Sequence, residues 1–319
     1  MVGTLSVIMT VYDQADYVGE AVESIIRQTY REFDFIIIDD GSDDQSLAKI
    51  QKYDDPRIRI FSRDHQGRGS ALNFALAQTN ATWVAFIDAD DIALPDRLLL
   101  QTRALAEDEA IDAISGWYQL VDERGNIIRE KRLPSKHEEI VELMPVQCSM
   151  CFPAAIIRKN ILVQAGMFDE KLVAAVDYDL WLKILDNAKF HNIPINLIKY
   201  RISSNSISSR LKDVQSRYAY EIGVRYLKEK YRIAQRDDAK AKISLKLGKL
   251  EYYQGTMVNA RRHLAKLLWY KPYFFITWRF YLASLLGNRV FTLLRSLGFA
   301  DSIGNIFRKS SVKHNYFVP

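Results

Sequence analysis

The sequence predicts an α/β fold with a mostly parallel sheet, followed by an α-helical C-terminal region. Three observations lead to this prediction. Short apolar runs alternate with segments of helical periodicity over the first hundred residues. The runs are continuously apolar, which is typical of parallel strands covered by helices on both faces. From about Val214 onward, the chain is basic and its periodicity is helical.

The first hundred residues supply the alternation of strands and helices. In residues 17–28, apolar side chains at Val18, Val22 and Ile25 recur at the spacing of one helical face. A further helix is expected to begin near Pro95. The expected strands are Leu5–Val11, Phe33–Ile38, Ile58–Phe61 and Trp83–Ile87, and the expected helices between them are 17–28, Ser46–Tyr53 and Ser70–Gln78.

Residues 112–165 are less regular. Ala113–Val121 is expected to be a strand, and residues 122–126, which include Gly125 and Asn126, a turn. A further strand is expected at Phe152–Ile157. A helix is expected within Leu172–Leu185. If it begins near Asp177, that carboxylate lies in its first turn.

The charge distribution suggests two regions, and the expected domain boundary lies near residue 210, giving 1–210 and 211–319. Residues 1–199 hold 21 Lys+Arg and 32 Asp+Glu, a net charge of −11, whereas residues 200–319 hold 23 and 7, a net charge of +16. The basic helical region fits contact with an anionic membrane surface, and it fits a solvated helical appendage equally well.

Two further patterns lie in the C-terminal region. The aromatic run 270–297 fits either a helical pair packed on the main domain or an interfacial membrane helix. One tetratricopeptide-like unit is weakly indicated by the spacing of Leu247, Gly248, Gly255, Ala260, Leu264 and Pro272.

The composition excludes several classes of protein. Hydrophobic residues make up 48% and charged residues 26%, as in soluble globular proteins. The chain shows no signal-peptide pattern and no apolar run long enough to span a membrane. Cys148 and Cys151 have no second pair or His cluster beside them, which argues against structural zinc and fits a reducing compartment. We therefore expect a cytoplasmic protein, held peripherally at the inner face of the membrane if the basic region binds lipid, with no nucleic-acid partner.

Polar clusters follow three of the expected strands, at residues 10–13, 39–42 and 88–91. In parallel sheets the ligand site lies beyond the carboxyl ends of the strands, so these clusters are expected to converge there. Residues 88–91 (Asp-Ala-Asp-Asp) concentrate three carboxylates whose repulsion a hard divalent cation would relieve. A solvated acidic turn before the next helix is the open alternative.

Five segments resemble family 2 glycosyltransferases of the GT-A fold: residues 6–12, 38–44, 86–91, 166–170 and 177–182. Their order and spacing match along residues 4–210. The resemblance implies inverting transfer of a sugar, most often from a UDP-sugar, to a glycan or lipid-linked acceptor in surface-polysaccharide synthesis. The Gln-X-X-Arg-Trp motif of processive synthases is absent, so addition of one sugar per encounter is expected.

The resemblance also implies residue roles, with Mn²⁺ or Mg²⁺ as cofactor. Thr10 and Tyr12 would border the base, Asp40 would hold the uracil edge, and Arg68 would approach the diphosphate. Asp90 would be the principal metal ligand, Asp88 would contact metal or ribose, and Asp91 would support the site or bind donor sugar. Asp177 would be the general base.

Simpler roles stay open for several of these residues. Asp40 can begin an Asx turn with Gly41. Arg68 can pair with a surface acid, and Asp177 can serve only as a helix N-cap. Asp179 competes for the role of base, because residues two apart on a helix do not share a face.

The chain departs from the family pattern at two positions. Val176 stands where many relatives carry Glu, and Ser203 where many carry a His that helps to ligate metal or phosphate. These departures motivate an alternative: a catalytically weak sugar-nucleotide-binding or scaffold protein. A nucleotidyltransferase is a third candidate, but residues 11–14 lack the Gly-rich basic loop that such an enzyme usually needs.

Overall fold

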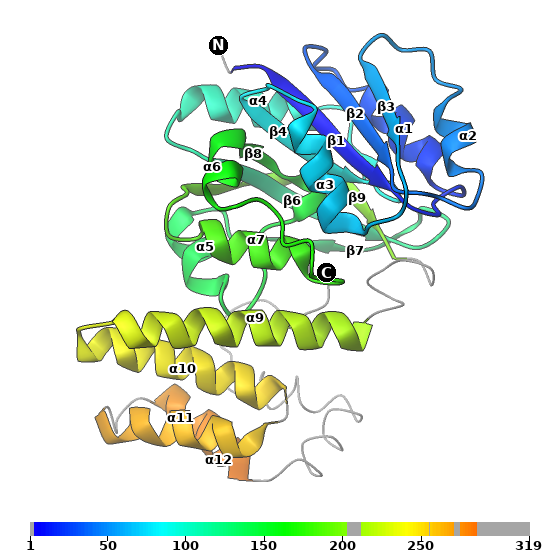
Figure 1. Ribbon diagram of the computed structural model, residues 1–319. Coiled ribbons are helices and arrows are strands. Elements are labelled where there is room, and N and C mark those ends of the chain that lie inside the picture. The colour runs from blue at the N-terminus through cyan, green and yellow to red at the C-terminus, as the bar shows by residue number, and fades with distance from the viewer. Residues whose placement is uncertain (1–2, 203–211, 255, 271–274, 286–319) are drawn as a thin grey trace. The chain divides into compact units, whose positions relative to one another are not determined.

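The computed structural model describes residues 3–202, 212–254, 256–270 and 275–285 (Figure 1). These residues form two compact units. The first is made of the chain up to Met144 together with Cys148–Gln215, and the second holds Pro145–Gln147 with the described residues from Ser216 onward, a boundary that falls within the first turns of α9 (Lys212–Ile233). Each unit is described by itself.

A nine-stranded mixed sheet forms the centre of the first unit, in the order β3-β2-β1-β4-β8-β6-β9-β5, with β7 paired to β6. Strands β3, β2, β1 and β4 run parallel, and the pairs of β8, β7 and β5 with their neighbours are antiparallel. The strands are β1 (Leu5–Val11), β2 (Asp34–Asp39), β3 (Ile58–Ser62), β4 (Trp83–Asp88), β5 (Ile92–Ala93), β6 (Ala113–Val121), β7 (Ile127–Lys131), β8 (Ile156–Arg158) and β9 (Phe190–Arg201).

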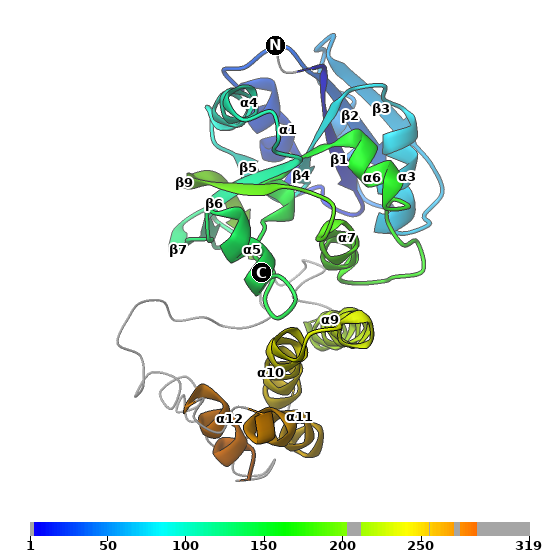
Figure 2. The same cartoon turned by 90° about the vertical axis from the view of Figure 1, so that its left-hand side faces the viewer.

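Helices cover both faces of this sheet. Figure 2 shows α1 and α4 on one side and α3 and α6 on the other. The helices of this unit are α1 (Val18–Ile26), α2 (Ser46–Ile50), α3 (Arg68–Ala77), α4 (Arg97–Glu107), α5 (His137–Leu143), α6 (Lys159–Gln164) and α7 (Val176–Ile184). The predicted α/β class with a covered sheet is confirmed.

The central strands are buried because their apolar runs are covered from both sides. Phe35, Ile37 and Phe86 are at most 1% exposed. One charged side chain also lies in this core: Arg97, at the start of α4, is fully buried and donates a hydrogen bond of 2.7 Å to the carbonyl of Phe86 in β4. Arg97 thus fixes the start of α4 to β4, the strand that leads into the acidic turn 88–91.

The structure corrects the sequence prediction at several places in this unit. Phe152–Ile157 is not one strand: a 3₁₀ helix, η1 (Phe152–Ala154), precedes β8. Pro153 explains the difference, because proline has no N–H to donate to a strand ladder. The helix expected at Ser46–Tyr53 ends at Ile50. The long strand β9 was not anticipated, since Pro194 and its polar residues obscure the apolar pattern.

The second unit is helical, as predicted for the C-terminal region. Leu227 of α9 packs with Leu247 and Leu250 of α10 and with Val146. Gly248 lets α10 and α11 approach closely, because a Cβ at this position would lie 2.7 Å from the side chain of Leu264. The helices are α9 (Lys212–Ile233), α10 (Asp237–Tyr253), α11 (Met257–Tyr270) and α12 (Phe275–Leu285).

Several predictions for this region extend beyond the described residues. Gly255, Pro272 and residues 286–297 of the aromatic run lie outside them. Within the run, Phe280 is buried and packs edge-on against Tyr252 at a centroid distance of 5.3 Å. Among the described helices, none is both long enough and apolar enough to cross a membrane.

Candidate active site

The carboxyl ends of β1, β2 and β4 lie side by side. In the parallel register, Thr10 of β1 is level with Asp88 of β4, and Val11 is level with Asp39 of β2. The expected convergence of the three polar clusters at one sheet edge is confirmed. It follows from the topology, because β1 is hydrogen-bonded to both other strands and runs parallel to them.

Three carboxylates meet in the turn after β4. Oxygen atoms of Asp88, Asp90 and Asp91 all lie within 4.8 Å of one another. Desolvation raises the pKa of Asp90 to about 6, and the neighbouring charge of Asp88 adds to this rise. Desolvation also raises the pKa of Asp91 well above its usual range. The cluster is therefore electrostatically unfavourable without a cation.

The chemistry of this cluster fits a divalent cation. Asp91 is only 1% exposed, and its Oδ2 has no hydrogen-bond partner among the described residues, whereas its Oδ1 accepts a hydrogen bond of 2.8 Å from the backbone N–H of Arg201. A buried carboxylate oxygen without a partner is costly. Carboxylate oxygens are the ligands that Mg²⁺ and Mn²⁺ prefer, so Asp88, Asp90 and Asp91 suit such an ion.

Arg68 neutralises part of this negative charge. It begins α3, and its Nη2 lies 2.7 Å from Oδ1 of Asp88. Its guanidinium also lies over the ring of Phe152, 5.4 Å from the centroid. Desolvation would lower the pKa of Arg68, but the carboxylates of Asp88 and Asp177 outweigh this effect and raise it. Arg68 is thus a fixed cation beside the acidic turn rather than a partner of a surface acid.

Strand β9 holds the acidic turn from the other side. Its last residue, Arg201, has a side chain only 2% exposed, which donates to the backbone carbonyl of Asp90 at 2.9 Å and pairs with Glu20 of α1 at 2.6 Å. The guanidinium also covers the ring of Tyr17 at 4.6 Å. Arg201 therefore connects the turn, α1 and the end of β9.

Tyr12 and Asp40 lie on the other side of the pocket. The ring of Tyr12 is 36% exposed and stacks on His65, with centroids 4.0 Å apart. Asp40 is only 3% exposed, and its carboxylate contacts Arg63 at 3.2 Å and His65 at 2.9 Å. Asp40 also accepts a hydrogen bond from the backbone N–H of Gly67, so it does more than begin an Asx turn.

Asp177 and Asp179 have different surroundings in the first turn of α7. Asp179 is 2% exposed and pairs with Lys183 at 2.8 Å. Asp177 is only partly buried, and its charge adds to the desolvation that raises the pKa of Asp88. It acts in the same way on Cys148, whose thiol pKa is raised to about 12 by desolvation first and by Asp177 second. Of the two carboxylates, Asp177 is therefore the one whose charge reaches Asp88.

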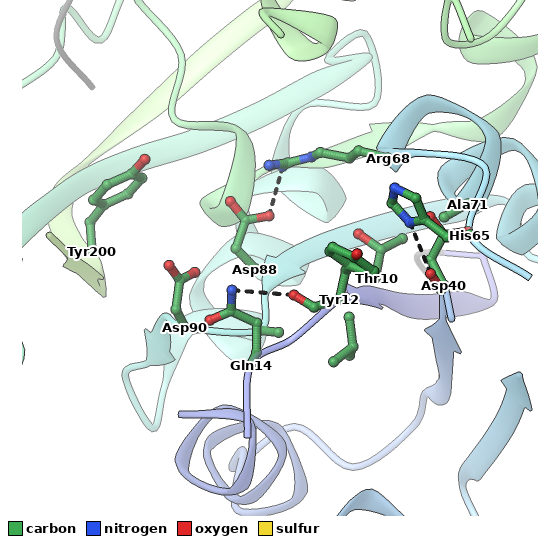
Figure 3. A pocket seen from close by; sticks show the side chains of 12 residues that line it. Thr10, Tyr12, Gln14, Asp40, His65, Arg68, Ala71, Asp88, Asp90 and Tyr200 are labelled. Carbon is green, nitrogen blue, oxygen red and sulfur yellow. Dashed lines mark hydrogen bonds and ion pairs between the residues drawn. The ribbon is translucent and has the colours of Figure 1, made fainter. Parts of the chain in front are cut away.

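A single pocket brings most of the predicted residues together (Figure 3). Of the predicted site residues, it is lined by Thr10, Tyr12, Asp40, Arg68, Asp88 and Asp90. Asp91 and Asp177 do not line it: Asp91 is a buried member of the acidic turn, and Asp177 reaches the site through its charge on Asp88. Val176, which replaces the family's Glu, is buried, and Ser203 lies outside the described residues.

The sequence alone missed four residues. His65, Gln14 and Tyr200 line the pocket, and Arg201 secures the acidic turn. Gln14 immediately follows the polar cluster at the end of β1, so its position was the available signal. Tyr200 and Arg201 belong to the run that ends at Ser203, where many relatives carry Tyr-Arg-X-His, and this run was the available signal although the strand that carries it was not predicted.

Sequence comparisons identify related proteins. The family model described as "Glycosyl transferase family 2" matches residues 6–165. The uncharacterized glycosyltransferase MJ1057 of Methanocaldococcus jannaschii is 34% identical over 224 residues, which cover 68% of this chain and 77% of that protein. The O-antigen biosynthesis glycosyltransferase WbnJ of Escherichia coli is 31% identical over 212 residues, which cover 63% of this chain and 81% of that protein.

Solved structures share the fold at low sequence identity. S. aureus TarS 1-349 in complex with UDP-GlcNAc gives a TM-score of 0.57 at 18% identity, covering 92% of each chain. The mannosyltransferase PcManGT from Pyrobaculum calidifontis, in complex with GDP-Man and Mn²⁺, gives 0.57 at 16% identity, covering 97% of this chain and 89% of that chain. The likeness to these structures, with the sheet topology, shows the GT-A fold, and the family match with the relative 34% identical shows that the chain belongs to glycosyltransferase family 2.

Proposed function

We propose that this glycosyltransferase moves a single sugar, with inversion, from a nucleotide-diphosphate sugar to a hydroxyl of a glycan or lipid-linked acceptor. The observation that carries the proposal is the meeting of two features at one sheet edge. The acidic cluster of Asp88, Asp90 and Asp91 adjoins a pocket that is bordered by Tyr12 and Asp40. A cation site next to an aromatic and carboxylate pocket suits a diphosphate joined to a base.

The base of the donor is uracil in this proposal. An ionised carboxylate only accepts hydrogen bonds, so Asp40 suits a base with a ring N–H. Uracil and guanine have such a group, whereas cytosine and adenine do not. The structural neighbours contain UDP-GlcNAc and GDP-Man, whose bases both meet this requirement. Thr10 and Tyr12 border the base, and Tyr12 offers its ring for stacking.

Asp90 is the principal metal ligand in the proposal, with Asp88 as a second ligand and Asp91 supporting the site. The cofactor is Mn²⁺ or Mg²⁺, and Mn²⁺ is present in the structure of PcManGT. When bound, such an ion neutralises the diphosphate as it leaves. Arg68, already beside Asp88, adds a fixed positive charge toward the diphosphate.

Asp177 is the general base. Its carboxylate accepts the proton of the acceptor hydroxyl as that oxygen bonds to the anomeric carbon of the sugar. The bond from that carbon to the diphosphate oxygen breaks on the opposite face, which inverts the configuration, and the nucleoside diphosphate leaves with the electron pair. Of the two carboxylates in α7, Asp179 is already paired with Lys183, which favours Asp177 for this role.

The setting is the synthesis of a surface or extracellular glycan, which the likeness to the O-antigen enzyme WbnJ supports. In the proposal, residues 1–210 form the catalytic domain and residues 211–319 a basic helical region that contacts an anionic membrane at its inner face. The net charge of +16 over residues 200–319 motivates this contact.

Product analysis tests the reaction. The full chain is incubated with UDP- and GDP-sugars and Mn²⁺, first without an acceptor to detect donor hydrolysis, then with lipid-linked glycan acceptors. We expect release of UDP that EDTA abolishes, and a product whose anomeric configuration by NMR is opposite to that of the donor. Release that survives EDTA would remove the metal role, and retained configuration would exclude the inverting mechanism.

A catalytically weak sugar-nucleotide-binding or scaffold protein is the competing candidate. The buried Val176, in place of the family's Glu, favours it because a supporting carboxylate is missing. Calorimetry with UDP and Mn²⁺ separates the two functions when it is combined with the hydrolysis screen. Tight binding without turnover of any donor supports the scaffold, and metal-dependent turnover supports the enzyme.

A further inference from the structure

His65 covers one face of Tyr12, the ring that borders the base in the proposed function. The two rings are nearly parallel, with an interplanar angle of 26° and centroids 4.0 Å apart (Figure 3). A base between two rings needs them about 7 Å apart, twice the contact distance of two carbon atoms. No base therefore fits between Tyr12 and His65 as they stand.

The imidazole of His65 also lies against the carboxylate of Asp40. Its Nδ1 lies 2.9 Å from Oδ2, and the backbone N–H of Gly67 donates to the same oxygen at 2.9 Å. The N–H of Gln66 lies 3.3 Å from Oδ1, and Nε of Arg63 lies 3.2 Å from it. A carboxylate accepts about four hydrogen bonds. These groups crowd the carboxylate, and the imidazole also hydrogen-bonds the backbone carbonyl of Asp40 at 3.0 Å, so a base N–H can reach Oδ2 only if His65 moves aside.

Of the groups around this carboxylate, the side chain of His65 is the one most able to move. The donors from Gln66 and Gly67 belong to the backbone. The side chain of Arg63 is 13% exposed and also donates to the Oγ of Ser70 at 2.9 Å, which holds it in place. The side chain of His65, by contrast, is 50% exposed.

The backbone of His65 is held by a close approach to Gly41, whereas its half-exposed imidazole contacts Tyr12 and Asp40. Gly41 has a φ of 74°, and a Cβ there would lie 2.7 Å from the backbone nitrogen of His65. This close approach, which glycine permits, packs the loop 63–67 against the end of β2. Rotation of the imidazole is thus the available movement that uncovers both Tyr12 and Asp40.

We propose that His65 is an internal competitor for the base subsite, whose imidazole must rotate away from Tyr12 and Asp40 before the donor nucleotide binds. This inference rests on the proposed function, because it takes the base to lie at Tyr12 and Asp40. His65 fills the subsite of the empty enzyme and lowers its affinity for nucleoside diphosphates. This would weaken retention of the UDP product as well as binding of the donor.

Calorimetry of UDP and GDP, each with Mn²⁺, tests the proposal on the full chain. We expect His65→Ala to bind UDP roughly tenfold more tightly than the native chain. The base then no longer has to displace the stack of His65 on Tyr12, and one aromatic stack corresponds to about this factor in affinity. His65→Phe frees Asp40 but still covers Tyr12, so its gain is expected to be smaller. Asp64→Asn, at an exposed neighbouring position in the same loop, is the matched control and is expected to bind as the native chain does.

NMR of protein with ¹³C-labelled histidine provides a direct readout. The chain has five histidines, and the signal missing from His65→Ala identifies His65. In the empty protein, the ring current of Tyr12 shifts this signal upfield, and addition of UDP is expected to remove the shift.

Three results would overturn the inference. Weaker UDP binding by His65→Ala means that His65 contacts the base, and equal binding means that it does not compete. A His65 signal that stays in place while UDP binds excludes the rotation. If neither UDP nor GDP binds to the native chain or to His65→Ala, the donor site itself fails, which is a distinct failure of the proposed function.

Discussion

At the residue scale, two carboxylates two positions apart on α7 differ because of their partners. Asp179 is held by Lys183 on its own helix, whereas Asp177 acts electrostatically on Asp88 and Cys148. The same comparison applies to Asp39 and Asp40 at the end of β2. Both are buried, but only Asp40 lines the pocket. Residue type alone distinguishes neither pair, since all four residues are aspartates.

Replacement of Asp177 by Asn tests the general base. We expect the rate of sugar transfer to fall about 10²- to 10⁴-fold, because the amide cannot accept the proton of the acceptor hydroxyl. Calorimetric binding of UDP is expected to stay unchanged. Asp179→Asn is the matched variant. It is expected to lose the ion pair with Lys183 and some stability, whereas the protein that remains folded is expected to transfer sugar at the native rate. The reverse pattern would make Asp179 the base.

Replacement of Asp90 by Asn tests the metal site. Mn²⁺ is expected to tighten UDP binding by at least about tenfold in the native chain, because the ion joins the carboxylates to the diphosphate. Asp90→Asn is expected to lose this gain. Asp96→Asn changes an exposed carboxylate six positions later and serves as the control. Calorimetric titrations with and without EDTA measure the effect, and an unchanged gain in Asp90→Asn would rule out Asp90 as principal ligand.

At the element scale, loops bring the strand ends into a fixed arrangement. Asp44 follows β2 and accepts hydrogen bonds from the backbone N–H groups of Ala15 at 2.9 Å and Ser46 at 2.8 Å. It thereby connects the loop after β1 with the start of α2. Desolvation opposes ionisation of Asp44, but the hydrogen bonds outweigh it and lower its pKa.

The contribution of Asp44 to stability is expected to depend on pH. A carboxylate with a lowered folded-state pKa stabilises the fold above its unfolded-state pKa, and the effect is lost as the pH falls through the folded-state value. We expect Asp44→Ala to lower the free energy of unfolding by about 1 kcal/mol at pH 7. The difference from the native chain is expected to shrink as the pH falls below 3.8. Urea unfolding at several pH values measures it, and a constant difference would contradict the assignment.

At the scale of the whole molecule, the two units differ in charge and in architecture. The first carries the sheet edge with its acidic cluster, and the second is a set of helices in a basic region of the chain. An acidic site suits a cation and a donor, whereas a basic helical region suits an anionic surface.

Vesicle binding tests the proposed membrane contact. The full chain is expected to sediment with vesicles rich in phosphatidylglycerol but not with phosphatidylcholine, and to be released by salt. A triple variant at exposed positions of the second unit, Arg232→Glu, Lys242→Glu and Lys266→Glu, is expected to bind about 100-fold more weakly, at about 1 kcal/mol per basic residue.

The matched control reverses three exposed charges of the first unit: Lys52→Glu, Arg103→Glu and Lys171→Glu. It is expected to keep vesicle binding, and both triple variants are expected to keep donor hydrolysis. Equal binding of the native chain to neutral and anionic vesicles would contradict the proposal.

Much of the first hundred residues could be predicted from the sequence. Continuous apolar runs identified β1, β2, β3 and β4, because a strand covered on both faces needs apolar side chains on both. Polar residues directly after those runs identified the sheet edge that carries Asp40, Asp88 and Asp90. These inferences succeeded because each depends on residues that are close together in the sequence.

The rest required contacts between distant segments. Arg201 meets Asp91 across 110 positions, and His65 meets Asp40 across 25. Neither contact leaves a local pattern, and β9 was hidden because its neighbours in the sheet, rather than its own residues, make it a strand. By itself, the sequence determined the fold class, the family and the acidic turn, because apolar runs and short motifs are local. Only the tertiary structure decided which side chains face the pocket, which are already paired and which cover the base subsite, because burial and partners depend on how remote segments pack.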